Sequence, residues 1–226
     1  MLSVVIPVFN EEEILRENFI KLNSFMKKNF KKYEIIICDN GSTDGTKEIG
    51  LKLAKKYNTL HFFSIKKRGV GLAFKEMVKR AKYDKIISLD MDLSVDMKFI
   101  LKSKLLDNCD IVIGSKKAGK QKRPVIRKFL SAGFIFLVGA FLGLTYKDYS
   151  IGAKMYRKSV IEKYIDEIDT GSSYVINIIF YAKRDGYKIK EVPVICNDKR
   201  KSKFKLINEI VYRFKGLVFL FLRTRK

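Results

Sequence analysis

The stretch Tyr33-Glu-Ile-Ile-Ile-Cys-Asp-Asn-Gly-Ser-Thr-Asp-Gly-Thr46 decides how this 226-residue chain folds. Residues 33–38 read as a strand that is buried on both faces, because apolar residues follow one another there without alternation. Gly41 then permits a tight turn, and Ser42, Thr43 or Asp44 can cap the helix that follows. A buried strand that leads straight into a helix is typical of a βαβ unit, and hence of a parallel sheet.

The same alternation continues on both sides of this stretch. Further apolar runs predict strands at Leu2–Val8, Leu60–Ile65, Lys85–Leu89 and Asp110–Ile113, and spaced apolar residues predict helices at Ile14–Phe30, Thr46–Tyr57 and Leu72–Tyr83. We therefore predict an α/β fold with a mostly parallel, Rossmann-like sheet flanked by helices. Ligands of such sheets bind beyond the carboxyl ends of the strands, so we look for functional residues there.

The composition limits the possible partners and chemistries. The chain has 47 Lys and Arg against 24 Asp and Glu, a net charge of +23 that attracts nucleic acid, anionic membranes or phosphorylated ligands. The cysteines, Cys38, Cys109 and Cys196, are odd in number and far apart, which favours reduced, mostly buried thiols. A single histidine, His61, is too little for most His-ligated metal sites or His-paired nucleophiles. Any metal ion must therefore sit on oxygen ligands.

Two polar clusters follow predicted strands in the first part of the chain. Asp39 and Asn40 stand at the tip of a buried strand, where a capped turn needs neither of them, and this predicts hydrogen bonds to the base or ribose of a ligand. The segment Lys66–Leu72 combines basic residues with two glycines at a helix entry, where backbone N–H groups and Arg68 suit a phosphate. A glycine turn with solvated lysines explains this second cluster equally well.

The segment Ser88-Leu-Asp-Met-Asp-Leu-Ser94 points to a metal ion. Asp90 and Asp92 lie two positions apart at the end of an apolar strand and can turn both carboxylates toward one point. Such carboxylates repel each other unless a proton or a cation compensates them, and hard divalent cations favour carboxylate and phosphate oxygens. The segment therefore predicts a divalent metal site.

The second half of the chain carries a long apolar run and an amphipathic end. Residues Phe129–Tyr146 contain no charge before Lys147, which is borderline for spanning a bilayer, and three glycines interrupt them. We favour two short helices at a membrane interface over one membrane-spanning helix, with a buried core helix as the plain alternative. Residues Lys203–Lys226 place apolar residues at helical spacing among lysines and arginines, as in a membrane-surface helix or a final helix packed on its own domain.

Five motifs together resemble the family-2 inverting glycosyltransferases of the GT-A fold. They are Ile6-Pro-Val-Phe-Asn-Glu-Glu12, Ile37-Cys-Asp-Asn-Gly-Ser-Thr-Asp-Gly-Thr46, Gly69-Val-Gly71, Asp90-Met-Asp-Leu-Ser94 and Ile113-Gly-Ser-Lys116. The segments Asp148-Tyr-Ser-Ile-Gly152, Gly186-Tyr187 and Glu191-Val-Pro-Val194 resemble the polyprenyl-phosphate branch, the dolichyl-phosphate mannose and glucose synthases. The resemblance covers roughly residues 1–205, and Asn177 departs from it where a glutamate is expected.

The resemblance implies a role for particular residues. Nucleotide binding falls to Pro7, Phe9, Glu11, Asp39, Asn40, Arg68, Gly69 and Asp90. A Mg²⁺ or Mn²⁺ ion is expected on Asp90, Asp92 and Ser94. The acceptor phosphate is expected on Lys116, Arg127, Arg200 and Lys203, and catalysis on Asp90, Asp92 and Arg127.

The same resemblance implies a domain organisation. Residues 1–200 form the GT-A domain, with a nucleotide-sugar-binding half at 1–115 and an acceptor half at 116–200 that includes apolar helices at 125–146. Residues 201–226 form a basic amphipathic helix.

We thus expect a metal-dependent inverting transferase. It moves mannose or glucose from GDP-mannose or UDP-glucose to a polyprenyl or dolichyl phosphate at the cytoplasmic membrane face, where it is peripheral or shallowly inserted. A phosphate acceptor needs no general base at neutral pH, because its second pKa is about 6.

Three alternatives stay open. The acceptor is a sugar hydroxyl of a glycan or glycolipid, with Asp148 or Asp169 as base; or the chain is a catalytically silent membrane-associated relative; or it is a basic nucleic-acid-binding protein. Nucleic acid is not expected as a partner, because Lys and Arg are dispersed and no binding motif is present.

Overall fold

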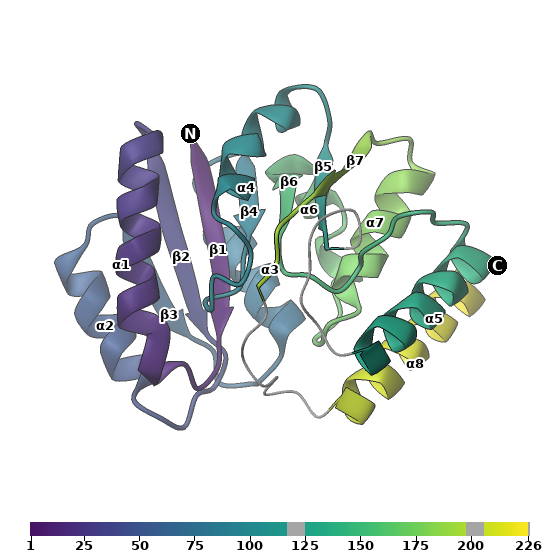
Figure 1. Cartoon of the computed structure of the whole chain (residues 1–226), viewed down its shortest axis with the longest axis horizontal. Coiled ribbons are helices and arrows are strands. Elements are labelled where there is room, and N and C mark those ends of the chain that lie inside the picture. Colours follow the sequence, from purple (N-terminus) through teal and green to yellow (C-terminus); the bar gives the residue numbers. More distant parts are fainter. Residues whose placement is uncertain (117–124, 198–205, 226) are drawn as a thin grey trace.

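The computed structural model describes residues 1–116, 125–197 and 206–225. Within them one sheet has the strand order β3-β2-β1-β4-β6-β5-β7 (Figure 1). All pairings are parallel except those of β6, which runs antiparallel to both β4 and β5. The strands are β1 (Leu2–Val8), β2 (Tyr33–Asp39), β3 (Leu60–Ser64), β4 (Lys85–Ser88), β5 (Ile111–Ser115), β6 (Lys154–Arg157) and β7 (Ile189–Pro193).

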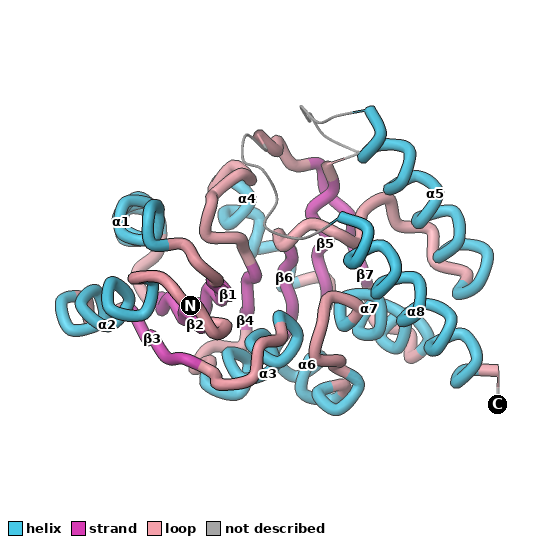
Figure 2. Tube along the Cα trace, turned by 90° about the horizontal axis from the view of Figure 1, so that it is seen from below, coloured by secondary structure: helices cyan, strands magenta, loops and turns pink. Residues whose placement is uncertain are grey.

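Helices cover both faces of this sheet, as Figure 2 shows. One face carries α1 (Glu12–Asn29), α2 (Thr46–Lys56), α4 (Lys98–Leu101) and the 3₁₀ segment η1 (Lys102–Asp107). The other carries α3 (Val70–Arg80), α6 (Lys158–Lys163), the short η2 (Ile165–Glu167) and α7 (Tyr174–Arg184). Two further helices, α5 (Val125–Leu142) and α8 (Leu206–Thr224), lie side by side and join the second layer.

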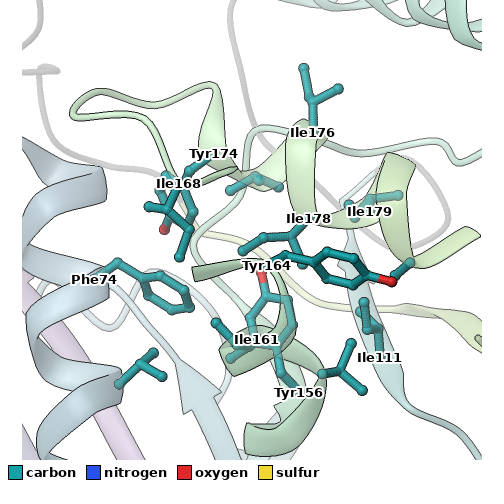
Figure 3. Packing of buried hydrophobic residues seen from close by; sticks show 14 of the residues in the cluster. Phe74, Ile111, Tyr156, Ile161, Tyr164, Ile168, Tyr174, Ile176, Ile178 and Ile179 are labelled. Carbon is teal, nitrogen blue, oxygen red and sulfur yellow. The ribbon is translucent and has the colours of Figure 1, made fainter. Parts of the chain in front are cut away.

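Each face of the sheet has its own apolar core. On the α1 side, Leu15, Phe19 and Leu22 are fully buried against β1 and β2. On the other side, Phe74 of α3 stacks on Tyr174 with ring centroids 4.8 Å apart, and Figure 3 shows both within the buried cluster. Burial of one such side chain stabilises the fold by about 1.5–3 kcal/mol. The two cores hold the sheet between the helical layers, and its carboxyl edge is left to the loops.

The structure confirms the expected α/β class, and each predicted strand begins and ends within two residues of an observed one. The three cysteines are free and buried, as expected. The prediction of two short helices in the uncharged run is wrong, because α5 is one continuous helix up to Leu142. The ring of Phe141 on α5 stacks on the ring of Phe221 on α8 with centroids 4.9 Å apart. This contact stabilises α5 although the helix contains two glycines.

The described residues include no helix with both the length and the apolar character that a bilayer crossing needs. The amphipathic C-terminal segment is helical from Leu206 to Thr224, but its relation to a membrane stays a prediction.

Gly50 tests the packing of α2 on the sheet. A Cβ at this position would come within 2.1 Å of the Phe62 ring on β3. Alanine normally stabilises a helix interior relative to glycine by about 1 kcal/mol. We expect Gly50→Ala to lower the free energy of unfolding by about 1–3 kcal/mol instead, because the ring must leave its place. Urea unfolding measures this. In a Phe62→Ala background the same change should no longer destabilise, and a stabilised Gly50→Ala single variant would contradict the packing.

Candidate functional site

The loops after β1 and β2 are locked together at the carboxyl edge of the sheet. Asn10 has a left-handed backbone, with φ of 54°, and its N–H donates to Ser42 Oγ at 2.9 Å. Its side-chain oxygen accepts the Thr43 N–H at 2.8 Å. Asp39, 2% exposed, accepts the Ser42 N–H at 2.9 Å on one carboxylate oxygen and the Ser64 hydroxyl at 3.0 Å on the other. These hydrogen bonds hold the carboxyl ends of β1, β2 and β3 in fixed positions relative to one another.

The basic segment after β3, Lys66–Leu72, contacts these strand ends through Asn40 and Phe9. The side-chain oxygen of Asn40 accepts the Gly69 N–H at 2.7 Å, which fixes the entry of α3 against the tip of β2. The Arg68 guanidinium lies 3.6 Å from the centre of the Phe9 ring, a cation–π contact that holds an exposed arginine over the end of β1. The structure therefore brings Phe9, Asp39, Asn40, Arg68 and Gly69 together at one edge of the sheet, and their binding of a nucleotide stays a prediction.

Asp90 and Asp92 follow β4 in a strained turn. Leu93 between Asp92 and Ser94 has φ of 48°, a left-handed conformation that is uncommon for a non-glycine residue. Asp92 Oδ1 accepts the Ser94 N–H at 2.9 Å. Asp90 is open to solvent on one side, while the protein on its other sides removes part of its hydration. This desolvation, and then the Asp92 carboxylate, raise the pKa of Asp90.

Gly152 lies directly against Asp90. A Cβ at residue 152 would come within 2.5 Å of both Asp90 carboxylate oxygens, and the Gly152 N–H hydrogen-bonds Asp90. Only a residue without a side chain lets the carboxylate rest on the backbone in this way. Gly152 thus connects the Asp90 turn to the segment that precedes β6.

That segment is organised by Asp148, a buried carboxylate that the sequence raised only as a candidate base. Asp148 Oδ1 accepts the Ser150 N–H at 2.9 Å, the Ser150 hydroxyl at 3.0 Å and the Ile151 N–H at 3.2 Å. Its Oδ2 accepts the Lys116 N–H at 3.2 Å. Burial alone would raise the pKa of Asp148, but the Lys116 and Lys154 ammonium groups and these donors outweigh it, so the pKa lies below its usual value. Asp148 is a structural anchor, which makes it a poor base.

Lys154 is a buried cation beside this anchor and was missed by sequence reasoning. It is 1% exposed, it donates to the Ile151 carbonyl, and both Asp148 and Asp90 act on its charge. Burial lowers the pKa of Lys154 to about 8. Because β6 is antiparallel, Lys154 begins that strand at the edge where β4 and β5 end. A four-residue strand leaves too weak a pattern in the sequence for this position to be predicted.

Of the four residues predicted to bind the acceptor phosphate, the structure describes the side chain of Lys116. Lys116 is 8% exposed and lies 4.0 Å from Asp148 Oδ2 and 3.4 Å from Ser150 Oγ. Arg200, Lys203 and the side chain of Arg127 lie outside the described residues. Asn177, which replaces the expected glutamate, donates to the Glu167 carbonyl at 2.9 Å. The acceptor assignments therefore stay predictions.

Cavities and clustered acids do not by themselves locate a site in this chain. The described part contains an open pocket of about 730 Å³ lined by residues 107–110, 157 and 185–188, at the sheet edge opposite the Asp90 turn. We place the candidate site at the carboxyl edge instead, because the polar side chains converge there. No group of three or more His, Cys, Asp or Glu side chains surrounds a metal position among the described residues. A metal ion at Asp90 and Asp92 would need further oxygen atoms from a ligand.

Comparison with known protein families agrees with this geometry. The sequence profile described as Glycosyl transferase family 2 matches residues 3–165, which include β1 to β6 and the Asp90 turn. The chain belongs to glycosyl transferase family 2. The predicted enzyme class, a glycosyltransferase, is confirmed with it.

Individual relatives and a solved structure add detail. Dolichyl-phosphate beta-glucosyltransferase ALG5A of Trichomonas vaginalis is 30% identical, over 91% of this chain and 68% of its own length. Glycosyltransferase AglD of Haloferax volcanii is 27% identical, over 92% of this chain but only 35% of its own length. Glucosyl-3-phosphoglycerate synthase of Mycobacterium tuberculosis, solved with Mn²⁺ and UDP-glucose, superposes with a TM-score of 0.72 at 18% identity, over 98% of this chain and 78% of its own. This superposition shows that the fold is GT-A.

Replacing Asp148 tests the anchor. We expect Asp148→Asn to lower the free energy of unfolding by about 3–5 kcal/mol, because it leaves the buried Lys116 and Lys154 without this counter-charge. Urea unfolding at neutral pH measures this. The matched control is Asp107→Asn, which breaks an exposed 2.6 Å ion pair with Lys85 and should cost under about 1 kcal/mol.

The pH dependence of this variant checks the charge state of Asp148. A carboxyl whose pKa is depressed in the folded state contributes its stability above the ordinary value of 3.8 and loses it as the pH falls through the folded pKa. The stability difference between wild type and Asp148→Asn should therefore not become smaller as the pH falls from about 7 to about 5, because Asp148 stays ionised and Lys154 keeps needing its counter-charge. A difference that shrinks across this range would mean that Asp148 is not ionised as described.

Proposed function

We propose that this glycosyltransferase moves a hexose from a nucleotide sugar to a polyprenyl phosphate at the cytoplasmic face of a membrane, and that a divalent cation assists it. The observation that carries the proposal is the Asp90–Asp92 pair at the end of β4, with the cations of Lys116 and Lys154 behind it. The relative from Trichomonas vaginalis, whose name specifies a dolichyl-phosphate glucosyltransferase, supports the lipid acceptor and glucose as the sugar. The chain is therefore best tested first with UDP-glucose, and then with GDP-mannose.

The parts of the nucleotide-sugar donor can be assigned to different groups of residues along the carboxyl edge of the sheet. Asp39 and Asn40 lie buried at the tip of β2, where they suit the nucleoside, and the Arg68 guanidinium over Phe9 suits a phosphate or a base. The backbone at the entry of α3 is held by Asn40, which keeps the Gly69 region in place for the diphosphate. Pro7, near the end of β1, and Glu11, just before α1, border the same edge.

The residues at the Asp90 turn fit a hard divalent cation. Desolvation, and then the neighbouring Asp92 carboxylate, raise the pKa of Asp90. The two carboxylates form an oxygen donor set that Mg²⁺ or Mn²⁺ would neutralise, together with diphosphate oxygens and Ser94. When bound, such an ion stabilises the negative charge that develops on the departing nucleoside diphosphate. Arg68 can support the same charge from the other side of the edge. The similar structure solved with Mn²⁺ and UDP-glucose supports a nucleotide-sugar donor together with a divalent ion.

The acceptor side explains why the chain needs no histidine base. A phosphate monoester is largely dianionic at neutral pH and attacks the anomeric carbon directly, whereas a hydroxyl must first lose a proton. Cations orient such a nucleophile, and Lys116, Arg127, Arg200 and Lys203 are the proposed ones. Attack from the face opposite the leaving diphosphate inverts the anomeric centre, so an α-linked donor gives a β-linked product.

The α5 and α8 helices suit a lipid surface next to this site. They lie side by side and expose large apolar side chains, of which Phe136 is 73% and Phe219 69% exposed. Basic residues such as Lys215 and Arg223 stand among them on α8. An amphipathic basic helix with exposed aromatic residues binds anionic interfaces, and this would bring the enzyme to a lipid-bound phosphate.

A sugar hydroxyl as acceptor is the second candidate, and one observation favours it. Asp169 Oδ1 is buried and has no hydrogen-bond partner among the described residues, so it keeps the capacity to accept a proton, which the saturated Asp148 lacks. The base for a hydroxyl acceptor would therefore be Asp169 rather than Asp148. Analysis of the product separates the two acceptors, because a glycosyl phosphate is labile to mild acid and a glycoside is not.

Replacing Asp92 tests the metal-assisted donor site. With labelled UDP-glucose or GDP-mannose, Mn²⁺ and dolichyl phosphate, we expect Asp92→Asn to lower the transfer rate by about a hundredfold or more. The control is Asp96→Asn, since Asp96 lies four positions on and its carboxylate accepts the Lys98 N–H at 2.8 Å. Unchanged transfer by Asp92→Asn would refute the metal role. Wild-type protein that never labels the organic phase would refute the lipid acceptor.

Replacing two exposed aromatic residues tests the membrane surface. We expect Phe136→Asp with Phe219→Asp to weaken binding to vesicles that contain phosphatidylglycerol by about tenfold or more, because both apolar insertions are lost. Vesicle co-sedimentation measures this. The matched control is Ile20→Asp with Leu51→Asp, which changes two exposed apolar residues on α1 and α2. Equal loss in both double variants would show that the α5–α8 surface has no special role.

A further inference from the structure

The C-terminal helix α8 reaches the nucleotide side of the candidate site through a single loop. The loop is Asp169–Gly171, between η2 and α7, and it lies between the entry of α3 on one side and α8 on the other. Nothing in the proposed function gives α8 a part in donor binding. The contacts on both sides of the loop nevertheless form one continuous path.

The first part of the path joins the loop to the entry of α3. The Gly71 N–H donates to the Thr170 carbonyl at 3.1 Å. A Cβ at Gly71 would come within 2.0 Å of the Asp169 carbonyl oxygen, and one at Gly69 within 2.5 Å of the Thr170 carbonyl oxygen. Backbone therefore packs on backbone, and glycines allow it. Any shift of the loop must move the Gly69–Gly71 turn, since no flexible side chain lies between them to absorb it.

The second part joins the loop to α8 through Tyr212. Its hydroxyl donates to Asp169 Oδ2, and its ring covers Gly171 so closely that a Cβ there would come within 2.3 Å of the ring. Burial, and then the Asp169 carboxylate, raise the pKa of Tyr212 to about 12, so the hydroxyl remains a proton donor at neutral pH. Gly216, one turn further along α8, packs in the same way on Ser173 at the start of α7.

The position of the Asp169 side chain depends on the hydrogen bond from the Tyr212 hydroxyl. One of its carboxylate oxygens is buried and has no hydrogen-bond partner in the described part of the chain, and the other accepts the Tyr212 hydrogen bond. A carboxylate in such surroundings is costly to leave without donors, so loss of the hydroxyl favours movement of Asp169 toward water. The loop that carries Asp169 would then pull on Gly69 and Gly71.

We propose that Tyr212 is a positioning residue for the nucleotide sugar: through Asp169–Gly171 it holds the Gly69–Gly71 turn in the conformation that binds the donor diphosphate. This inference rests on the proposed function, in which the turn contacts the donor. It extends that function, because it makes α8 a structural part of the donor site as well as a candidate membrane surface. At the other end of the turn, Asn40 passes the same constraint to the tip of β2.

The test compares Tyr212→Phe with Tyr33→Phe in the full-length chain. Tyr33 is the matched control, because its hydroxyl also makes a side-chain hydrogen bond, to Asn23 Oδ1 at 2.9 Å, at the opposite edge of the sheet. Calorimetric titration with UDP and with GDP, each with Mn²⁺, measures affinity without any lipid acceptor. We expect Tyr212→Phe to weaken binding of the preferred nucleotide about fivefold or more, the lower range of coupling between sites, and Tyr33→Phe to change it less than about twofold.

A double-variant comparison shows whether the effect passes through Asp169. In an Asp169→Asn background, Tyr212→Phe should weaken nucleotide binding by less than about a further twofold, because residues of one network are not additive. The same fivefold loss in that background, or wild-type affinity of Tyr212→Phe alone, would overturn the proposal.

Hydrogen exchange keeps the test independent of ligand binding. Wild-type protein that binds neither UDP nor GDP would refute the proposed donor, not the positioning role. The exchange rate of the Gly71 amide decides that case, since this N–H bonds to Thr170. It should rise in Tyr212→Phe and stay unchanged in Tyr33→Phe, and equal rates in both variants would overturn the proposal.

Discussion

The compensation of buried charge around Asp148 is the constraint on which the candidate site depends. Two ammonium groups, Lys116 and Lys154, are almost fully enclosed at the junction of β4, β5 and β6. Removing cations from water costs several kcal/mol each unless carboxylates and backbone groups replace the water. Asp148 and the Ile151 carbonyl do this, and the need to serve both lysines fixes the whole turn before β6. Gly152 follows at once, so the same turn supports the carboxylate of Asp90.

Close backbone contacts extend this order to the nucleotide side. Gly69 and Gly71 rest on the loop Asp169–Gly171, just as Gly152 rests under Asp90. In each case a glycine removes the flexible side chain that would otherwise separate two segments. The candidate site is therefore rigid where loops from distant parts of the sequence meet, and its halves cannot move independently there. Such preorganisation suits a reaction in which charge develops at a fixed place.

The sequence predicted those parts of the fold whose pattern is local. Strands buried on both faces appear as continuous apolar runs, which is why β1 and β2 were placed almost to the residue. Asp39, Asn40 and Arg68 could be named as candidates because each lies at or after the end of a strand that the pattern had already located. The helix α5 was divided wrongly, because the strands after it must rejoin the sheet and three glycines interrupt the uncharged run, but one continuous helix meets both conditions. Glycine costs a helix only about 1 kcal/mol, and packing against α8 offsets this.

The parts that the sequence did not predict depend on contacts across long separations. Lys154 belongs to a short antiparallel strand, and its importance appears only when β6 is seen between β4 and β5. Tyr212 follows the helical spacing of α8 and has no signal of its own, yet it lies on Gly171, forty-one positions earlier. Asp169 was named as a candidate base, but its pairing with Tyr212 was not foreseen.

The choice between a phosphate and a hydroxyl acceptor depends on whether any carboxylate at the site is able to take a proton from the acceptor. Asp39 uses both its oxygens on Ser42 and Ser64, and Asp148 is saturated by donors, so neither can take a proton from a substrate. Within the described residues, Asp169 keeps one oxygen without a hydrogen-bond partner, but its other oxygen accepts the Tyr212 hydroxyl and its backbone carbonyl packs against Gly71. A base held in this way has little freedom to follow a proton. A nucleophile that arrives already ionised avoids this demand, which is the physical reason to favour a phosphate acceptor in a chain with one histidine.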